Sequence, residues 1–339
     1  MEQAVSFNSY TPILEIRDVE DFRRPGDFTM HGDRRDGRLY RYTPEIKLAV
    51  NVALATGRPL LILGATGCGK SSVANNLARI MRRRYYEFVV TSRSQARDLL
   101  YRFDAVRRLG DSQSRNHRKL PLATSGSADQ VWQTQFPYVE PGPMWWSLDR
   151  RTASRRGYPG EEKLPFSEGV DPVIWEPEPS SNGGSVLLID EIDKAEPDFP
   201  SNLLVPLGSW QFTVDEVATT IYLPGAGETQ HPALRPLVII TSNRERELPD
   251  TFLRRCVVLE IPTPTLDQLV QLAITTFGKP DDGFFRNIAH RLLELRGENN
   301  LSIVEYLDAI LAIERLQAAD PALSEIVKLS AWRSAEGSL

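Results

Sequence analysis

The chain has 339 residues, of which 41% are hydrophobic and 25% charged. This is the composition of a folded protein with about two domains, and it excludes disordered and collagen-like chains. The formal net charge of −5 argues against nonspecific coating of nucleic acid as the main activity. Cys68 and Cys256 fit neither a disulfide framework nor a metal pair, and no run approaches the ~18 apolar residues of a membrane span. We therefore expect a cytoplasmic protein.

The first 81 residues predict an arm, a helix and a strand-loop-helix unit. Residues 1–40 are polar and interrupted by Pro and Gly, so we interpret them as an arm or small cap. Apolar residues at helical spacing predict a helix over 43–57, which ends at Gly57. The apolar run at 59–64 predicts a buried strand, and the spacing in 71–81 predicts a second helix.

Three more apolar runs, at 85–90, 185–190 and 234–242, are separated by stretches long enough for helical crossovers. Buried parallel strands with intervening helices predict an α/β sandwich. The pattern after Pro264 is entirely helical and predicts a small all-α unit. Its candidate helices are 266–277, 284–296, 302–316 and 321–332.

A G-x-x-x-x-G-K-S motif lies between the predicted strand 59–64 and helix 71–81. Its backbone N–H groups and the positive end of the helix can wrap a polyphosphate. Lys70 would then reach the β and γ phosphates, and the Ser71 hydroxyl would bind Mg²⁺. The alternative is a glycine-rich turn that happens to contain a lysine. The candidate residues are Gly64, Ala65, Thr66, Gly67, Cys68, Gly69, Lys70, Ser71 and Ser72, and we interpret Cys68 as an inert small residue.

Polar residues follow two of the other apolar runs. Asp190 and Glu191 end the run at 185–190, where Asp190 would hold Mg²⁺ and Glu191 would orient and deprotonate the attacking water. Asn243 ends the run at 234–242 and could position the same water. The alternatives are a solvated strand end for the carboxylates and a turn-forming residue for Asn243.

Two arginines, Arg254 and Arg255, follow in the segment Leu-Pro-Asp-Thr-Phe-Leu-Arg-Arg-Cys at 248–256. A guanidinium supplied to the γ phosphate stabilises the charge of the transition state. Ordinary surface arginines are the alternative. No NKxD guanine signature is present, so ATP is favoured over GTP.

In this order, the motifs resemble those of AAA+ ATPases, and more narrowly those of the MoxR branch. Val-Glu-Pro-Gly-Pro-Met at 139–144 is similar to the xPGP(I/L) segment before the branch's Walker B strand, and Asp-Glu-Ile-Asp-Lys-Ala at 190–195 to its DEINRA. The segment 248–255 is similar to its LPEAxLDRF, with Arg255 on the finger arginine. The resemblance covers about residues 41–335.

This resemblance implies a three-layer αβα P-loop core with a parallel sheet and a C-terminal all-α lid. The implied division is an arm at 1–40, a core at 41–265 and a lid at 266–339. The family's helix-2 insert would fall within 104–138, and its hairpin before the sensor strand within 211–234.

The resemblance also implies a Mg²⁺-dependent ATPase that forms a ring, expected to be a hexamer, in which Arg255 reaches the neighbour's ATP. The finger position reads Leu-Arg-Arg-Cys, so Arg254 competes with Arg255 for this role. No sensor-2 arginine stands in Asn-Leu-Ser-Ile-Val at 300–304. MoxR relatives usually remodel or activate a protein target with a von Willebrand factor A domain protein, and some resemble parts of bacterial conflict-defence systems.

A DNA-associated motor or loader is the alternative function. Its support is a local basic cluster near two aromatic residues, as opposed to a solvated loop or a contact between subunits. The cluster comprises Arg107, Arg108, Arg115, His117, Arg118 and Lys119, with Trp132 and Phe136 nearby. No role is assigned to the long segment 150–184.

Overall fold

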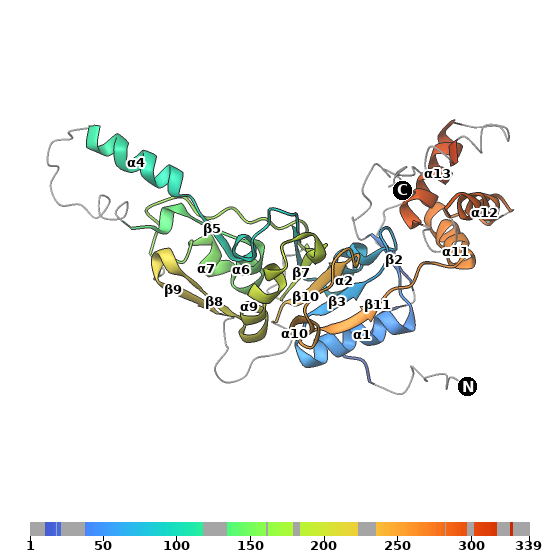
Figure 1. The fold of residues 1–339 in the computed structure, drawn as a ribbon, viewed down its shortest axis with the longest axis horizontal. Helices are drawn as coiled ribbons and strands as arrows, with labels where there is room; N and C mark the ends of the chain where they lie inside the picture. The colour runs from blue at the N-terminus through green and yellow to red at the C-terminus, as the bar shows by residue number, and fades with distance from the viewer. Residues whose placement is uncertain are drawn as a thin grey trace.

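The structure is a computed structural model of the chain (Figure 1). It describes residues 11–17, 19–21, 38–117, 134–160, 162–178, 184–222, 235–281, 283–296, 302–316 and 326–327.

The described strands include a five-stranded parallel sheet in the order β11-β3-β10-β7-β4. Its strands are β3 (Leu60–Leu63), β4 (Arg84–Val89), β7 (Ser185–Asp190), β10 (Leu237–Ser242) and β11 (Val257–Glu260). Four of them confirm the predicted apolar runs. The sequence analysis missed β11, which exposes Val258 and Glu260 and so lacks the nearly continuous buried apolar run that marks β3. Parallel pairing with β3 holds it in the sheet.

Helices cover both faces of this sheet, which confirms the predicted αβα layering. Alternate strand residues point to opposite faces, so Leu61 and Leu187 join one apolar core while Ile62 and Leu188 join the other. The second core is closed by α1 (Pro44–Thr56) and α2 (Lys70–Met81). On the first face lie α3 (Ala96–Leu100), α6 (Pro143–Leu148), α7 (Arg150–Ser154), α8 (Asp198–Asn202) and α9 (Leu204–Ser209).

Two groups of elements lie outside the five-stranded sheet, at and around the stretches 104–138 and 211–234 where insertions are expected. The first holds β5 (Tyr101–Phe103), α4 (Ala105–His117), the 3₁₀ turn η1 (Phe136–Tyr138) and β6 (Val139–Pro141). Helix α4 extends away from the rest of the molecule (Figure 1). The second is an antiparallel hairpin of β8 (Gln211–Val214) and β9 (Thr219–Tyr222), joined by the 3₁₀ turn η3 (Asp215–Val217). Residues 118–133 and 223–234 lie outside the described residues.

The segment 150–184, to which sequence analysis gave no role, covers the edge strand β4. Tyr85 N–H donates to Trp175 O at 2.8 Å, and Ile174 N–H donates to Tyr85 O at 2.9 Å. The Arg79 guanidinium lies 4.8 Å from the centre of the Trp175 ring. An uncovered edge strand offers its backbone groups to other chains, so this segment protects the sheet from edge-to-edge pairing.

The C-terminal helices α11 (Leu266–Phe277), α12 (Phe284–Arg296) and α13 (Ile303–Leu316) share an apolar core of their own. They confirm three of the predicted helices. Of the fourth, 321–332, only residues 326–327 are described, and these are helical. None of the helices among the described residues is long and apolar enough to span a membrane.

Three shorter features complete the described chain. In the N-terminal arm, β1 (Val19–Asp21) pairs with β2 (Leu39–Arg41) in antiparallel fashion. The 3₁₀ turn η2 (Ile192–Lys194) follows β7, and α10 (Asp250–Leu253) precedes β11.

Gly142 provides a test of how tightly the inserted segments pack on the sheet. A Cβ at this position would lie 2.4 Å from Leu99 O and 2.6 Å from Asp98 O, both backbone atoms of α3. We expect Gly142→Ala to lower the free energy of unfolding in urea by about 1–3 kcal/mol, because overpacking forces the backbone to shift. Gly110→Ala is the control: a Cβ there meets nothing within 4 Å, and Ala favours the helix α4 in which it lies, so this variant should not lose stability. Equal stability of Gly142→Ala and the unmodified chain would contradict this packing.

Candidate functional site

The glycine-rich loop connects the carboxyl end of β3 with the first turn of α2, as the sequence predicts. Gly67 and Gly69 have φ angles of 78° and 92°, in the left-handed region that favours glycine. Gly69 is the N-cap of α2, and Lys70 is its first residue. The positive end of α2 therefore faces the loop, which is the arrangement that binds phosphate groups.

Lys70 lies across the loop. Its Nζ donates to Gly64 O at 2.9 Å, Ala65 O at 2.8 Å and Asn243 Oδ1 at 2.7 Å. Burial lowers the pKa of Lys70, and nearby charges, among them those of Asp190 and Glu191, act in the opposite direction. Phosphate oxygens are stronger acceptors than these neutral groups, because hydrogen bonds between charged groups are shorter and stronger. The ammonium is thus in place for a polyphosphate in the loop.

Asp190 ends β7 and is fully buried. Its Oδ1 accepts hydrogen bonds from Ser71 Oγ and from Thr241 Oγ1, each at 2.6 Å. The predicted Mg²⁺ ligands Ser71 and Asp190 are therefore in direct contact. Sequence analysis missed Thr241, which lies near the end of β10, two residues before Asn243.

Glu191 follows Asp190 and adopts a left-handed backbone conformation with φ of 61°. Its N–H donates to Thr241 Oγ1 at 2.8 Å. One carboxylate oxygen accepts from Lys194 Nζ at 2.6 Å, and the other accepts from Asn243 Nδ2 at 3.2 Å. The hydrogen bond to Glu191 raises the pKa of Lys194. The two candidates for handling water, Glu191 and Asn243, thus touch each other.

Asp193 positions Asn243 and is a further residue that sequence analysis missed. Its carboxylate is buried and accepts from the backbone N–H groups of Asn243 at 3.1 Å and Glu245 at 2.8 Å. Lys194 was also missed as a contact of Glu191. Asp193 and Lys194 both belong to the segment 190–195, whose resemblance to DEINRA marked it as part of the site. The resemblance did not indicate which residues they contact.

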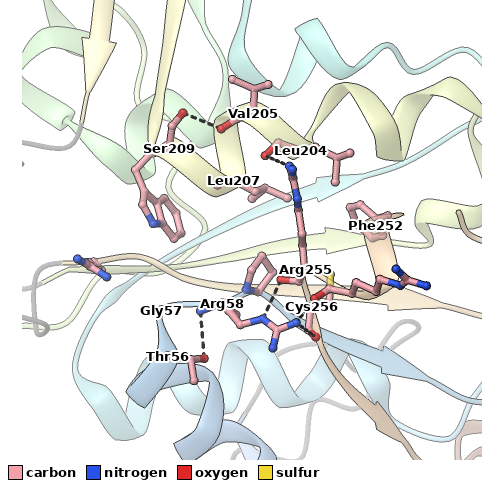
Figure 2. A pocket seen from close by; sticks show the side chains of 15 residues that line it. Thr56, Gly57, Arg58, Leu204, Val205, Leu207, Ser209, Phe252, Arg255 and Cys256 are labelled. Atoms are coloured by element: carbon pink, nitrogen blue, oxygen red, sulfur yellow. Dashed lines mark hydrogen bonds between the residues drawn. The ribbon is translucent and has the colours of Figure 1, made fainter. Parts of the chain in front are cut away.

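The arginine pair lies at the amino ends of the sheet strands, opposite the carboxyl ends where the glycine-rich loop lies. Arg254 and Arg255 come just before the amino end of β11, whereas the glycine-rich loop follows the carboxyl end of its neighbour β3. Both arginines are exposed. Arg255 Nη1 donates to Leu204 O at 3.3 Å, and the two side chains line a cavity of about 790 Å³ (Figure 2). The structure does not bring them to the glycine-rich loop of their own chain.

Residues 59–256 match the family described as AAA domain (dynein-related subfamily), and this match spans more than half of the chain. The chain belongs to the AAA domain family. Nucleotide binding and ATPase-type nucleotide hydrolysis are general properties of this family, and its members commonly form oligomers.

Several solved structures resemble this AAA protein, all at low identity. The RuvB Holliday junction branch migration motor of Thermotoga maritima is 14% identical, with a TM-score of 0.40, 84% of this chain covered and 65% of that chain. A point mutant of that RuvB has a TM-score of 0.41 at 14% identity, with 84% and 66% covered. A Cytophaga hutchinsonii protein named as an ATPase is 11% identical, with a TM-score of 0.37 and coverage of 84% and 78%. This chain thus spans slightly less than two thirds of the length of both RuvB chains. No curated protein sequence matches this chain.

The N-terminal arm and the C-terminal helices both contact the glycine-rich loop of this AAA domain. Ile303 N–H, at the start of α13, donates to Gly67 O at 3.0 Å. A Cβ on Gly69 would lie 3.5 Å from the Tyr40 ring. Sequence analysis assigned no chemistry to residues 1–40, yet Tyr40 lies against the candidate phosphate loop. Ser302, in the segment 300–304 that lacks a sensor-2 arginine, lies directly against Gly67.

The remaining predicted loop residues surround the same site. Thr66 is exposed on the loop, and Ser72 is half-buried in the first turn of α2. Cys68 is buried, and burial raises the pKa of its thiol. Burial also raises the pKa of Cys256, to about 12. Both thiols are therefore protonated near neutral pH.

The basic cluster of the alternative function lies on and after α4. The Arg107 guanidinium lies 5.9 Å from the centre of the Tyr138 ring, and Tyr138 Oη donates to Asp111 at 3.1 Å. Arg108 is exposed. The side chains of Arg115 and His117, and the whole of Arg118, Lys119 and Trp132, lie outside what the structure describes.

Thr241 tests whether this site depends on the buried hydroxyl. We expect Thr241→Val to lower the free energy of unfolding by about 1–3 kcal/mol, because the partly buried Glu191 N–H loses its acceptor and the buried Asp190 carboxylate loses a donor. Nucleotide hydrolysis should fall at the same time, since Asp190 and Glu191 lose a shared partner. Urea unfolding and a phosphate-release assay measure the two effects. Thr213→Val removes an exposed hydroxyl from the β8–β9 hairpin and should change neither quantity.

Proposed function

We propose that this chain is a Mg²⁺-dependent ATPase of the ring-forming AAA+ type, with each active site completed by a neighbouring copy. One observation carries the proposal. Lys70, Asp190, Glu191 and Asn243 are joined by hydrogen bonds at the carboxyl edge of the sheet, directly or through Thr241.

The residues of this site fit a nucleotide with Mg²⁺. Hydroxyl and carboxylate oxygens are the ligands that Mg²⁺ prefers, and Mg²⁺ usually binds one or two carboxylates together with phosphates and water. Ser71 Oγ and Asp190 Oδ1 supply such a pair. When bound, Mg²⁺ neutralises charge on the β and γ phosphates.

Glu191 is the proposed general base, and Asn243 is its partner in orienting water. A carboxylate in this position accepts the proton of the attacking water. The Asn243 amide donates to Glu191, while its own oxygen accepts from Lys70. This amide therefore links the proposed base to the ammonium that faces the phosphates, so one side chain aligns both groups.

The ring follows from the position of the arginines. A parallel strand rises about 3.3 Å per residue, so the four residues of β3 separate the amino ends of the strands from their carboxyl ends by about 13 Å. Arg254 and Arg255 therefore suit the nucleotide of a second copy. We assign the finger to Arg255, which occupies the position of the resemblance, with Arg254 as the alternative, and we propose a hexamer.

We also propose the division into an arm at 1–40, a core at 41–265 and a lid at 266–339. The separate apolar core of α11, α12 and α13 supports the lid. Its contact with Gly67 would let it respond to the nucleotide.

The finer assignment is to the MoxR branch. The stretches 139–144, 190–195 and 248–255 support it. In the first, Gly142 packs against the backbone of α3, and in the second, Asp193 and Lys194 contact Asn243 and Glu191. On this assignment the protein remodels or activates a protein target together with a von Willebrand factor A domain protein, in a setting such as a bacterial conflict-defence system.

Glu191→Gln tests the proposed base. We expect this variant to bind ATP with unchanged affinity and to lose turnover by about 10²-fold or more, because the amide cannot take the proton. Isothermal titration with ATP and a phosphate-release assay measure the two quantities. Lys70→Ala is the contrasting control and should lose ATP binding itself. Hydrolysis by Glu191→Gln at the parental rate would mean that another group is the base.

The proposed partner has its own test. Co-purification with the von Willebrand factor A domain protein of a neighbouring gene should yield a stable complex, and its addition should raise the ATPase rate. The same protein with its metal-binding motif disrupted is the matched control. Neither binding nor stimulation by any such neighbour would contradict the MoxR assignment without affecting the ATPase.

A further inference from the structure

One arginine outside the predicted motifs holds the segment that carries the finger arginines. Arg58 lies between Gly57, which ends α1, and Pro59, which precedes β3. Its Nε donates to Arg255 O at 3.2 Å, and its Nη2 donates to Cys256 O at 2.9 Å and also to Arg254 O. A single guanidinium thus contacts three consecutive carbonyls, and Figure 2 shows Arg58 beside Arg255 and Cys256.

These contacts continue the pairing of β3 with β11. Leu60 faces Val257 in the register of the two strands, and Val257 N–H donates to Pro59 O at 2.8 Å. Beyond this point the chain turns into α10 and strand pairing stops. Arg58 therefore extends the connection between the two segments by side-chain hydrogen bonds, over the three residues where backbone pairing is not available.

The surroundings of this segment suit an anion. The cavity of about 790 Å³ is lined by four arginines, Arg58, Arg235, Arg254 and Arg255, and by no Asp or Glu among the described residues. Arg58 is occupied by backbone carbonyls, whereas Arg255 makes one long, exposed hydrogen bond to Leu204 O. That bond is weak enough for a phosphate oxygen of a neighbouring copy to replace it.

We propose that Arg58 is the positioning residue of the arginine finger. It fixes the backbone at 254–256, so that the finger side chain projects toward the nucleotide of the neighbouring copy in one defined orientation. This inference rests on the proposed function, because it needs a finger acting between copies. Arg58 touches no nucleotide itself and acts through Arg255 or Arg254.

The chemistry of the side chain explains why an arginine is needed. A guanidinium presents its N–H donors in a rigid planar fork, whereas a lysine ammonium is a point charge on a flexible stem. Three carbonyls in sequence require donors that are spread over several ångströms. Lysine at this position can serve part of the set only.

The first test separates turnover from binding. We expect Arg58→Ala to lower kcat for ATP by about 10²-fold, the effect of a misplaced catalytic group, with unchanged ATP affinity. Arg58→Lys should retain an intermediate rate. Arg155→Ala is the matched control, because Arg155 also donates to backbone carbonyls, those of Tyr158 and Glu162, but elsewhere. It should hydrolyse ATP at the parental rate. Parental kcat in Arg58→Ala, or lost ATP binding, would overturn the proposal.

The second test uses mixed rings, purified through two different tags. Lys70→Ala copies bind no ATP but carry intact Arg58 and finger residues. Rings that combine them with Arg58→Ala copies should regain ATPase activity, because the intact finger then serves the intact loop of its neighbour. The double variant Arg254→Ala, Arg255→Ala should behave in the same way. Rescue of the double variant without rescue of Arg58→Ala would mean that Arg58 only supports the fold, and would overturn the inference.

The third test needs no hydrolysis. Hydrogen exchange at the amides of 255–257 should be faster in Arg58→Ala than in the unmodified chain, and unchanged in Arg155→Ala. Equal exchange in all three proteins would overturn the inference while leaving the ATPase proposal intact. Conversely, faster exchange in a protein without any ATPase activity would confirm that Arg58 holds the segment and would place the failure in the proposed function.

Discussion

The buried carboxylate of Asp190 is the point on which the site depends. A buried charge is costly unless hydrogen bonds or ion partners compensate for it, and Asp190 obtains two hydroxyl donors from different elements, Ser71 of α2 and Thr241 of β10. These two bonds fix the relative positions of the glycine-rich loop, the end of β7 and the end of β10. The alignment of the candidate catalytic groups therefore follows from the need to satisfy one carboxylate.

The backbone next to Asp190 is held in a costly conformation. Glu191 has φ of 61°, and a non-glycine residue in this region costs of order 1–3 kcal/mol. The hydrogen bond from its N–H to Thr241, and the contacts of its side chain with Lys194 and Asn243, hold it there. This geometry turns the carboxylate of Glu191 toward Asn243. If β7 continued as a regular strand, the side chain of Glu191 would instead point to the face of the sheet opposite that of Asp190.

The two ends of the parallel strands carry different groups of residues. The carboxyl ends gather the phosphate loop, the acidic residues and Asn243, while the amino ends hold Arg58 and the arginine pair. A chain built this way offers a nucleotide site at one end of the strands and a cationic segment at the other. Two copies can therefore complete each other, which is the physical basis of the proposed ring.

The amino-acid sequence by itself determined the features that depend on local pattern. The glycine-rich loop, the acidic strand end, Asn243 and four of the five sheet strands follow from apolar runs and from motifs a few residues long. Only the tertiary structure decided what these residues touch. Thr241, Asp193 and Arg58 act through partners that are distant in the chain, 197 residues away for Arg58 and Arg255. The edge cover by Trp175 likewise depends on a strand far from it in the sequence. Such contacts arise when the sheet assembles, because parallel pairing brings separate strand ends together, and no local spacing encodes them.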